Sequence, residues 1–360
     1  MQQQPPTTHR VAVIPGDGIG TEVMPAAQRV LERAGELYGF SWQWTELDWS
    51  CERYTRTGAM MPPEGLAQLA EHDQIFLGAV GHPGVPDPVS LWGLLIPIRR
   101  AFEQYVNLRP VRLLRGIDSP LRTLPPEGLD FVVVRENSEG EYSEIGGRMN
   151  SGTPREAAVQ QTVFTRVGVE RVARYATDLA VARQGRLTSA TKSNGIIHTM
   201  PFWDEVVAEV SAAAGVQLTS VHIDALAAQF VLDPGRFDVV VASNLFGDIL
   251  TDLGAAIIGS IGIAPSANLN PEREHPSMFE PVHGSAPDIA GRGVANPVGQ
   301  IWSGAMMLTH LGHDDAAAAV MAAVEDALED GAGRTPDLGG RASTTSAADA
   351  VTQGLRAPAV

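Results

Sequence analysis

The residue that stands out first is Lys192, because it is the only lysine among 26 Lys and Arg residues. It follows a predicted strand, 187–190, and has the hydroxyls of Thr191 and Ser193 beside it. An ammonium can lose its proton when its surroundings lower its pKa, whereas a guanidinium keeps its proton in proteins. A retained lysine in such an arginine-rich chain indicates proton transfer or a need for a compact cation, with chance survival as the alternative.

Three arginines lie at the ends of predicted elements: Arg99, Arg109 and Arg135. A guanidinium binds a carboxylate through two parallel hydrogen bonds, so two or three of them could hold both ends of a small dicarboxylate. Arg135 is the best candidate because it directly follows a buried run, 131–134. Ordinary surface arginines are the alternative. Tyr142 comes seven residues after Arg135 and could join the same site or pack in the core.

Two carboxylates, Asp248 and Asp252, are spaced four apart on a predicted helix that follows a buried strand. Like charges at this spacing repel each other, so a cation between them is a reasonable inference. Oxygen ligands favour Mg²⁺ or Mn²⁺ over zinc. Asp224, after another strand, could supply a third carboxylate. Ile249 and Leu253 directly follow the two acids and are predicted to turn towards the core. A solvated helix face has the same spacing and stays an alternative.

A polar loop rich in proline and glycine runs from Glu280 to Gly291. Asp288 could accept both hydroxyls of an adenosine ribose, and its charge would repel a 2′-phosphate, which favours NAD over NADP. A plain surface loop is the alternative.

A glycine-rich turn, Gly16-Asp-Gly-Ile-Gly, ends the predicted first strand. It is not the dinucleotide fingerprint, because its third glycine comes two residues after the second instead of three. A tight structural turn explains it as well as a ligand loop does.

Short apolar runs alternate with helical patterns along the chain, which predicts an α/β protein. Strands are expected at 10–14, 74–80, 131–134, 187–190, 219–223 and 238–242, and helices at about 21–35 and 94–104. The strands are expected to be buried on both faces. Between 139 and 165 the pattern changes to that of a protruding hairpin, an arm of the kind that serves dimerisation.

The formal net charge of −16 argues against binding to nucleic acid or to an anionic membrane. The single cysteine, Cys51, cannot form an intrachain disulfide, and Met1–His9 lack the basic start and apolar stretch of a signal peptide. The longest apolar run, 253–265, is shorter than the roughly 20 residues a membrane span needs. A cytoplasmic location is therefore expected.

These stretches, in this order, resemble the family of metal-dependent decarboxylating dehydrogenases that includes isopropylmalate and isocitrate dehydrogenases. The resemblance runs from about Arg10 to Val351. It rests on five motifs: Gly16-Asp-Gly-Ile-Gly, Asn107-Leu-Arg-Pro, Thr191-Lys-Ser-Asn, Asn244-Leu-Phe-Gly-Asp and His283-Gly-Ser-Ala-Pro-Asp. Within the family, Ser90-Leu-Trp-Gly-Leu-Leu, Phe102-Glu-Gln-Tyr-Val-Asn and 241–250 are most similar to the members that act on tartrate or D-malate.

The resemblance implies a two-domain α/β fold with a central cleft and a β-hairpin dimerisation arm, distinct from the Rossmann fold. One domain, 1–104 plus 259–360, would be built from both chain ends and carry most of the NAD site. The central domain, 105–258, would carry the dimer interface and the arm, at about 139–165.

The resemblance also implies roles for single residues. Arg99, Arg109 and Arg135 would bind substrate carboxylates, and Tyr142 would protonate the enol. Asp248 and Asp252 would bind the metal together with the partner subunit's Asp224, and Lys192, the base, would also come from the partner of a homodimer. The NAD site maps onto His283, Gly284, Ser285, Ala286 and Asp288, with Asn296 on the adenine side and Glu280 near the nicotinamide.

The implied reaction is oxidation of a small (2R)-hydroxy dicarboxylate with NAD and Mn²⁺ or Mg²⁺, and K⁺ as an allowed further cofactor. D-malate would give pyruvate and CO₂; tartrate would give oxaloglycolate, with or without decarboxylation. Activity on 3-isopropylmalate is the alternative, and Trp92 argues against it because a bulky side chain at the rim should shrink the pocket. A catalytically silent regulatory subunit is a more remote alternative, since every acid, the lysine and the tyrosine are present.

Overall fold

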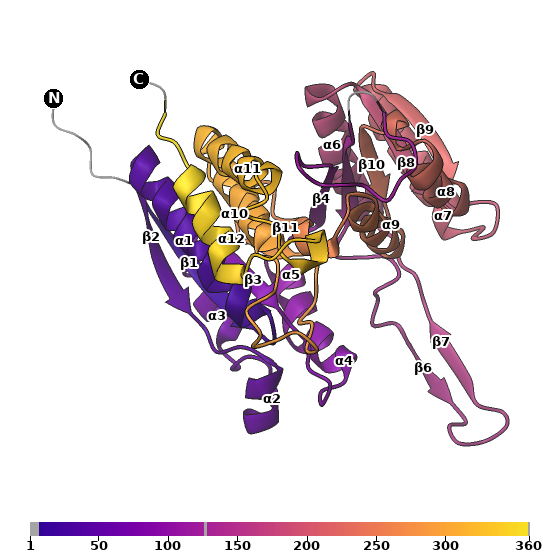
Figure 1. The fold of residues 1–360 in the computed structure, drawn as a ribbon. Coiled ribbons are helices and arrows are strands. Elements are labelled where there is room, and N and C mark those ends of the chain that lie inside the picture. Colours follow the sequence, from indigo (N-terminus) through magenta and orange to yellow (C-terminus); the bar gives the residue numbers. More distant parts are fainter. Residues whose placement is uncertain (1–6, 126–127, 359–360) are drawn as a thin grey trace. The chain divides into compact units, whose positions relative to one another are not determined.

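The computed structural model describes residues 7–125 and 128–358 and divides the chain into two compact units (Figure 1). Unit 1 comprises Met1–Gln104, Leu113–Pro120 and Ala255–Val360, and unit 2 comprises Tyr105–Arg112 and Leu121–Gly254. Most of the segment Met1–His9, considered above as a leader, lies outside the described residues.

The sheet of unit 1 has the strand order β2-β1-β3-β12-β11. Pairing is parallel from β2 to β12, and β11 runs antiparallel to β12. The strands are β1 (Thr7–Gly16), β2 (Phe40–Glu46), β3 (Gln74–Ala79), β11 (Pro265–Leu269) and β12 (Ser277–Pro281). Because β12 lies between β3 and β11, both ends of the chain contribute neighbouring strands.

The core of unit 1 forms where β1 meets its covering helices. Val11, Val13 and Ile14 are fully buried, since β1 has a neighbouring strand on each side. Helix α1 (Gly20–Tyr38) buries Val23, Ala27, Val30 and other residues at helical spacing, which is the face it packs on β1, β2 and β3.

The other helices of unit 1 lie on the sheet or on one another. Helices α10, α11, α12 and α1 pack together, and α10 also covers β11 and β12. Their bounds are α10 (Val298–His310), α11 (Asp314–Glu329) and α12 (Thr344–Gly354). Shorter helices are α2 (Cys51–Thr57), α3 (Gly65–Leu69), α4 (Asp87–Ser90), the π-helical turn η1 (Leu91–Leu95) and α5 (Ile96–Ala101); 3₁₀ turns are η3 (Ile261–Ile263) and η4 (Pro336–Leu338).

Unit 2 has a sheet with the order β4-β5-β10-β8-β9. Strands β4 and β5 are antiparallel, and the other pairs are parallel. The strands are β4 (Val106–Arg112), β5 (Asp130–Glu136), β8 (Arg186–Thr191), β9 (Gln217–His222) and β10 (Val239–Ala242). The helices are α6 (Arg166–Ala182), α7 (Thr199–Ala213), α8 (Ile223–Leu232), the 3₁₀ turn η2 (Pro234–Arg236) and α9 (Asn244–Ile257), the last of which belongs to unit 2 as far as Gly254.

The predicted hairpin is present in unit 2 as an exposed arm. Strands β6 (Gly146–Met149) and β7 (Ala157–Gln160) pair antiparallel, and Figure 1 shows them extending away from the rest of the unit. All residues of both strands are exposed, and apolar Met149 and Val159 are among them.

Two expectations about the strands are wrong in part. The strand predicted at 219–223 is β9, and it is largely exposed instead of buried on both faces, because it lies at the sheet edge beyond β8. The loop predicted to start at Glu280 begins within β12, so Glu280 is a buried strand residue. Glu280 is buried because β12 lies between β3 and β11, a placement that the local sequence does not reveal.

No helix within residues 7–125 and 128–358 has both the length and the apolar character needed to span a membrane.

The neutral side chain of His310 contributes to the stability of unit 1. Its Nε2 lies 3.1 Å from the Ser277 hydroxyl, and burial, aided by the positive charge of Arg273, lowers its pKa to about 4 from 6.5. The unfolded chain therefore binds more protons between pH 6.5 and about 4, so stability falls as the pH falls through this window.

We expect His310→Gln, which keeps a hydrogen-bonding group without the titration, to lose less stability on acidification. Relative to wild type, its loss between about pH 7 and about pH 5 should be smaller by about 1 kcal/mol, or a few degrees in the midpoint of thermal unfolding. Melting curves at both pH values measure this, and equal losses in the two proteins would contradict the role of His310.

Candidate functional site

The guanidinium of Arg135 joins the end of β5 to the first turns of α9. In the parallel register Arg135 pairs with Ala242, two residues before α9 begins. Its Nε and Nη2 donate to Asn244 Oδ1 at 3.2 and 2.6 Å, and its Nη1 donates to Asp248 Oδ1. A Cβ at Gly247 would lie 2.6 Å from the side chain of Arg135, so only glycine permits this approach.

Arg109, on β4, reaches the same helix one turn further along. Its Nη1 donates to the Thr251 hydroxyl at 2.6 Å and lies 3.6 Å from Asp248 Oδ1 and 3.9 Å from Asp252 Oδ1. The Thr251 hydroxyl in turn donates to the carbonyl of Asp248. Two buried arginines of the predicted set are therefore brought to one face of α9.

The carboxylates of Asp248 and Asp252 lie side by side on that face. Partial burial and then the negative charge of Asp248 raise the pKa of Asp252, while Arg109 acts in the opposite direction. The Asp252 side chain is still 63% exposed, which leaves its carboxylate open to a ligand. Paired carboxylate oxygens suit Mg²⁺ or Mn²⁺. Within the described residues, however, no three His, Cys, Asp or Glu side chains gather as a metal-binding group, and α9 offers two carboxylates.

The orientation expected for Ile249 is wrong. It is 53% exposed, whereas Phe246 and Leu250 are buried. The buried face of α9 therefore contains Phe246 and Leu250, and Ile249 lies on the exposed face of the helix.

Tyr142 lies at the same face of α9. Its hydroxyl donates to Asp248 Oδ2 at 3.1 Å, and the Arg135 guanidinium carbon is 5.7 Å from its ring centroid. Of the two interpretations open from the sequence, the structure favours the site over core packing. The same acid thus accepts hydrogen bonds from a candidate proton donor and from a candidate carboxylate-binding arginine.

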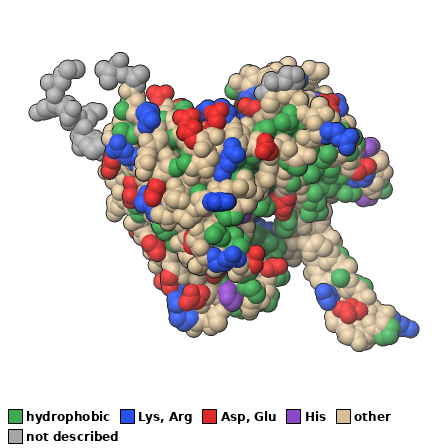
Figure 2. Space-filling view, viewed as in Figure 1, with side chains coloured by type: hydrophobic (Ala, Val, Ile, Leu, Met, Phe, Trp, Pro, Cys, Tyr) green, Lys and Arg blue, Asp and Glu red, His purple; other side chains and the backbone are tan. Residues whose placement is uncertain are grey.

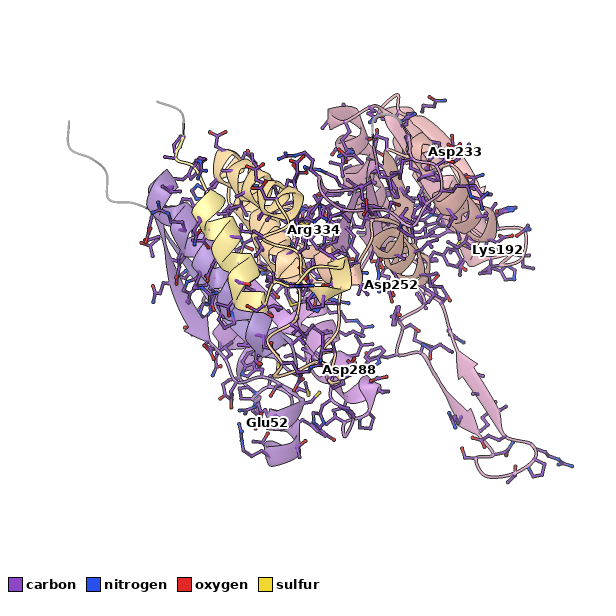
Figure 3. All side chains as sticks on the ribbon, viewed as in Figure 1. Glu52, Lys192, Asp233, Asp252, Asp288 and Arg334 are labelled. Atoms are coloured by element: carbon purple, nitrogen blue, oxygen red, sulfur yellow. The ribbon has the colours of Figure 1, made fainter. Side chains whose placement is uncertain are left out.

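Lys192 and Asp224 pair with each other. Lys192 Nζ lies 2.5 Å from Asp224 Oδ1, and this hydrogen bond is the largest contribution to lowering the pKa of Asp224. Lys192 follows β8, and in Figure 3 it lies apart from Asp252. Within one chain, Asp224 therefore does not join Asp248 and Asp252.

Arg99, on α5 of unit 1, is paired with Glu280 of β12. Arg99 Nη2 donates to Glu280 Oε1 at 2.9 Å, and Asn268 Nδ2 donates to the same oxygen at 2.7 Å. Both charged side chains are about 10% exposed. Arg99 Nε is buried with no partner among the described residues, which leaves a donor available to a ligand.

The glycine turn after β1 supports the loop that carries the other candidate residues of unit 1. Ile19 N donates to Ser285 O at 2.9 Å, and a Cβ at Gly18 would lie 2.0 Å from that oxygen. Gly18 also has φ +55. The turn is therefore a structural one that positions the loop. The following Ala286 has φ +39, a strained backbone of the kind found at ligand sites.

His283 presents an unpartnered acceptor. Its Nδ1 lies 3.0 Å from Gly284 O, and burial lowers its pKa, so the neutral ring carries its proton on Nδ1. Nε2 is then a buried acceptor without a partner in the described part of the chain. Such an atom fits a ligand that offers an N–H group.

The other candidate residues of this loop differ in their surroundings. Asp288 is exposed, whereas Asn296 is buried, donates to Asp337 and accepts from Val298 N at the start of α10. Gly284, Ser285 and Pro287 line a pocket of about 580 Å³ together with residues 80–87.

Sequence reasoning missed three residues of the α9 site: Asn244, Thr251 and Glu141. Asn244 accepts from Arg135, Thr251 accepts from Arg109, and Glu141 accepts from Ser243 Oγ and Leu245 N. Asn244 stands in a motif quoted above, so its signal was present, whereas nothing local marks Glu141, whose partners lie about a hundred residues away.

Comparisons with known proteins place this geometry in a family. The model of isocitrate/isopropylmalate dehydrogenases matches residues 10–352. A probable tartrate dehydrogenase/decarboxylase of Bacillus subtilis (strain 168) is 54% identical over 349 residues, 96% of this chain and 98% of that protein. A decarboxylating D-malate dehydrogenase of Escherichia coli (strain K12) is 55% identical over 353 residues, with coverage of 96% and 98%.

Solved structures of isocitrate and β-decarboxylating dehydrogenases are also similar to this chain. Isocitrate dehydrogenase from Methylococcus capsulatus has a TM-score of 0.87 at 35% identity, covering 96% of this chain and 99% of that chain. A β-decarboxylating dehydrogenase from Thermococcus kodakarensis has a TM-score of 0.76 at 38% identity, covering 96% of each. The predicted fold class, and the resemblance to proteins named for tartrate and D-malate, are confirmed. This chain belongs to the isocitrate/isopropylmalate dehydrogenase family.

Proposed function

We propose that this protein oxidises a small (2R)-hydroxy dicarboxylate, D-malate or tartrate, with NAD⁺ and Mn²⁺ or Mg²⁺. The observation that carries the proposal is the cluster on α9, where two arginines, two aspartates and a tyrosine meet. Relatives of this chain are named dehydrogenases that also decarboxylate. With D-malate the products would be pyruvate, CO₂ and NADH.

The charges at α9 suit an anionic substrate and a cation together. Arg109 and Arg135 would bind substrate carboxylate, and Arg99 of unit 1 would offer a third guanidinium. Asp248 and Asp252 would hold the metal. A bound divalent cation lowers the pKa of the substrate hydroxyl and polarises the ketone that oxidation forms.

Two residues would move protons. Lys192, as a neutral amine, would accept the proton of the substrate hydroxyl while hydride passes to NAD⁺. Tyr142, which donates to Asp248, would deliver a proton from its hydroxyl to the enol carbon after CO₂ departs. The protons and electrons then balance, because the two electrons of oxidation leave as hydride.

The loop of unit 1 would bind NAD. His283 Nε2, the unpartnered acceptor, would accept from the amino group of adenine, and exposed Asp288 would accept from the ribose hydroxyls. Asn296, which accepts from Val298 N at the start of α10, would lie on the adenine side, and Glu280 would lie near the nicotinamide. Gly284, Ser285 and Ala286 would approach the cofactor through their backbone.

We propose a homodimer in which Lys192 and Asp224 of each subunit complete the α9 site of its partner. The proposed metal would need a ligand beyond the two carboxylates of α9, and a partner subunit could supply it. Exposed apolar side chains of unit 2 also support a dimer: Ile145, Met149, Val159, Ile197, Leu232 and Ile249. Figure 2 shows apolar side chains gathered on the visible face of unit 2 above the arm. The buried free thiol of Cys51 is consistent with a cytoplasmic enzyme.

The function is tested by NADH formation on D-malate, the tartrate isomers, 3-isopropylmalate and isocitrate, each with Mn²⁺ and with Mg²⁺. We expect the highest kcat/KM with D-malate or a tartrate, because Trp92 would narrow the substrate pocket; its side chain is half-buried, with Arg100 over its ring. A chelator should abolish turnover and added Mn²⁺ should restore it. Preference for 3-isopropylmalate would overturn the substrate assignment, and turnover in chelator would overturn the role of α9.

Replacing the only lysine tests proton transfer. Lys192→Arg keeps the charge and can keep the pairing with Asp224, but its guanidinium cannot act as a base. We expect kcat to fall on the order of 10²- to 10⁴-fold. The control is Arg186→Lys, the reverse exchange at an exposed position of the same strand. A near-normal kcat for Lys192→Arg would exclude the lysine as base.

Asp288→Asn tests the preference for NAD. Removing the charge should weaken NAD⁺ binding and lower the repulsion of a 2′-phosphate, so the kcat/KM ratio of NADP⁺ to NAD⁺ should rise by about tenfold. Glu52→Gln removes an exposed carboxylate elsewhere in unit 1 and is the matched control (Figure 3). An unchanged ratio would contradict the placement of Asp288 at the ribose.

A further inference from the structure

Three glutamates lie close together in the chain, Glu136 as the last residue of β5 and Glu139 and Glu141 in the segment that follows it. Each carboxylate accepts hydrogen bonds from backbone or hydroxyl groups at a turn or a helix start. Glu136 accepts from Ser138 and from Glu139 N within its own turn. Glu139 accepts from the backbone and hydroxyl of Thr165, the residue before α6, at 2.8 and 2.6 Å. Glu141 does the same at the start of α9. The carboxylates of Glu139 and Glu141 therefore attach this segment to the starts of α6 and α9.

Glu141 binds the first turn of α9 with both oxygens. Ser243 Oγ donates to Oε1 at 2.8 Å, and Leu245 N donates to Oε2 at 3.1 Å. Amide groups at a helix start lack partners within the helix, and the helix dipole favours a negative charge there. Glu141 is thus a helix cap supplied by a loop 102 residues away from Ser243.

The cap stands directly beside Tyr142. The backbone before it is fixed by the pairing of Gly140 with Val163, whose two N···O distances are 2.9 and 3.3 Å. The backbone after it is held by Ser143 Oγ, which donates to Gln161 O. Between these points, Glu141 ties the chain to the helix that carries Asp248, the acceptor of the Tyr142 hydroxyl. Residues 140–143 therefore position both the Tyr142 hydroxyl and its acceptor, Asp248.

We infer that Glu141 is a positioning residue that holds the Tyr142 hydroxyl in register with Asp248 by capping α9. The inference rests on the proposed function, in which Tyr142 protonates the enol. Glu141 itself touches neither substrate nor cofactor in this assignment. Its loss should slow the protonation step more than it affects the binding of NAD⁺.

The test compares wild type with Glu141→Leu and Glu141→Gln on D-malate. Leucine removes both acceptors, whereas glutamine keeps an amide oxygen that accepts from Leu245 N and gains an amide NH2 that donates to the Ser243 hydroxyl. We expect kcat to fall about ten- to a hundredfold in Glu141→Leu, with a larger solvent deuterium isotope effect on kcat and little change in KM for NAD⁺. Glutamine should restore most of the loss.

Glu139→Leu is the matched control, because it removes the equivalent contacts at α6. It should lower the midpoint of thermal unfolding without raising the isotope effect. If it reproduces the kinetic changes of Glu141→Leu, general loosening of the segment explains them and the inference is wrong. A normal kcat and isotope effect in folded Glu141→Leu would also overturn it.

Ser243→Ala covers the case in which Glu141→Leu does not fold, since it removes one of the two donors. It should lower kcat severalfold with the same rise in isotope effect, and an unchanged enzyme would count against the cap. Failure of the proposed function is a separate result, because it would show as absence of D-malate and tartrate turnover in wild type.

Discussion

The site on unit 2 depends on one buried cation, the guanidinium of Arg135, held between Asn244 and Asp248. A buried charge is costly unless it is paired and hydrogen-bonded, and α9 supplies both kinds of partner within two turns. The demand explains the local sequence: Asn244 at the start of the helix, glycine at 247 to admit the arginine, and Asp248 one turn later. This pairing positions α9, and α9 in turn carries Asp252 and presents Asp248 to the Tyr142 hydroxyl.

The negative charges of Asp248 and Asp252 are compensated by nearby arginines as well as by solvent. Asp248 is shared by Arg135, Arg109 and Tyr142, while Asp252 keeps an exposed carboxylate whose pKa is raised. A cation would relieve the repulsion between the two acids, and a bound dicarboxylate would offset the arginines. In the proposed function, metal and substrate would therefore stabilise each other's binding, since each compensates the charge that the other leaves.

Local patterns in the sequence predicted the α/β alternation, the arm and the residues that meet at α9. Arg109, Arg135, Asp248 and Tyr142 could be found because each stands beside a recognisable strand, helix or motif. Glu141 and β12 could not, since their contacts come from segments far away in the chain. Ile249 was misplaced because i,i+4 spacing identifies a common face and not which face is buried; packing against β5 and β4 decides that.

The placement of β12 between β3 and β11 has a consequence for the order in which the chain can fold on the ribosome. Once residue 254 has emerged, every strand of unit 2 has been synthesised, so that unit can fold while synthesis continues. Unit 1 must wait, because β3 lacks its neighbour until residues 277–281 arrive. During that interval β3 presents an open edge whose residues are all buried in the finished fold, and this edge stays open until β12 has been made.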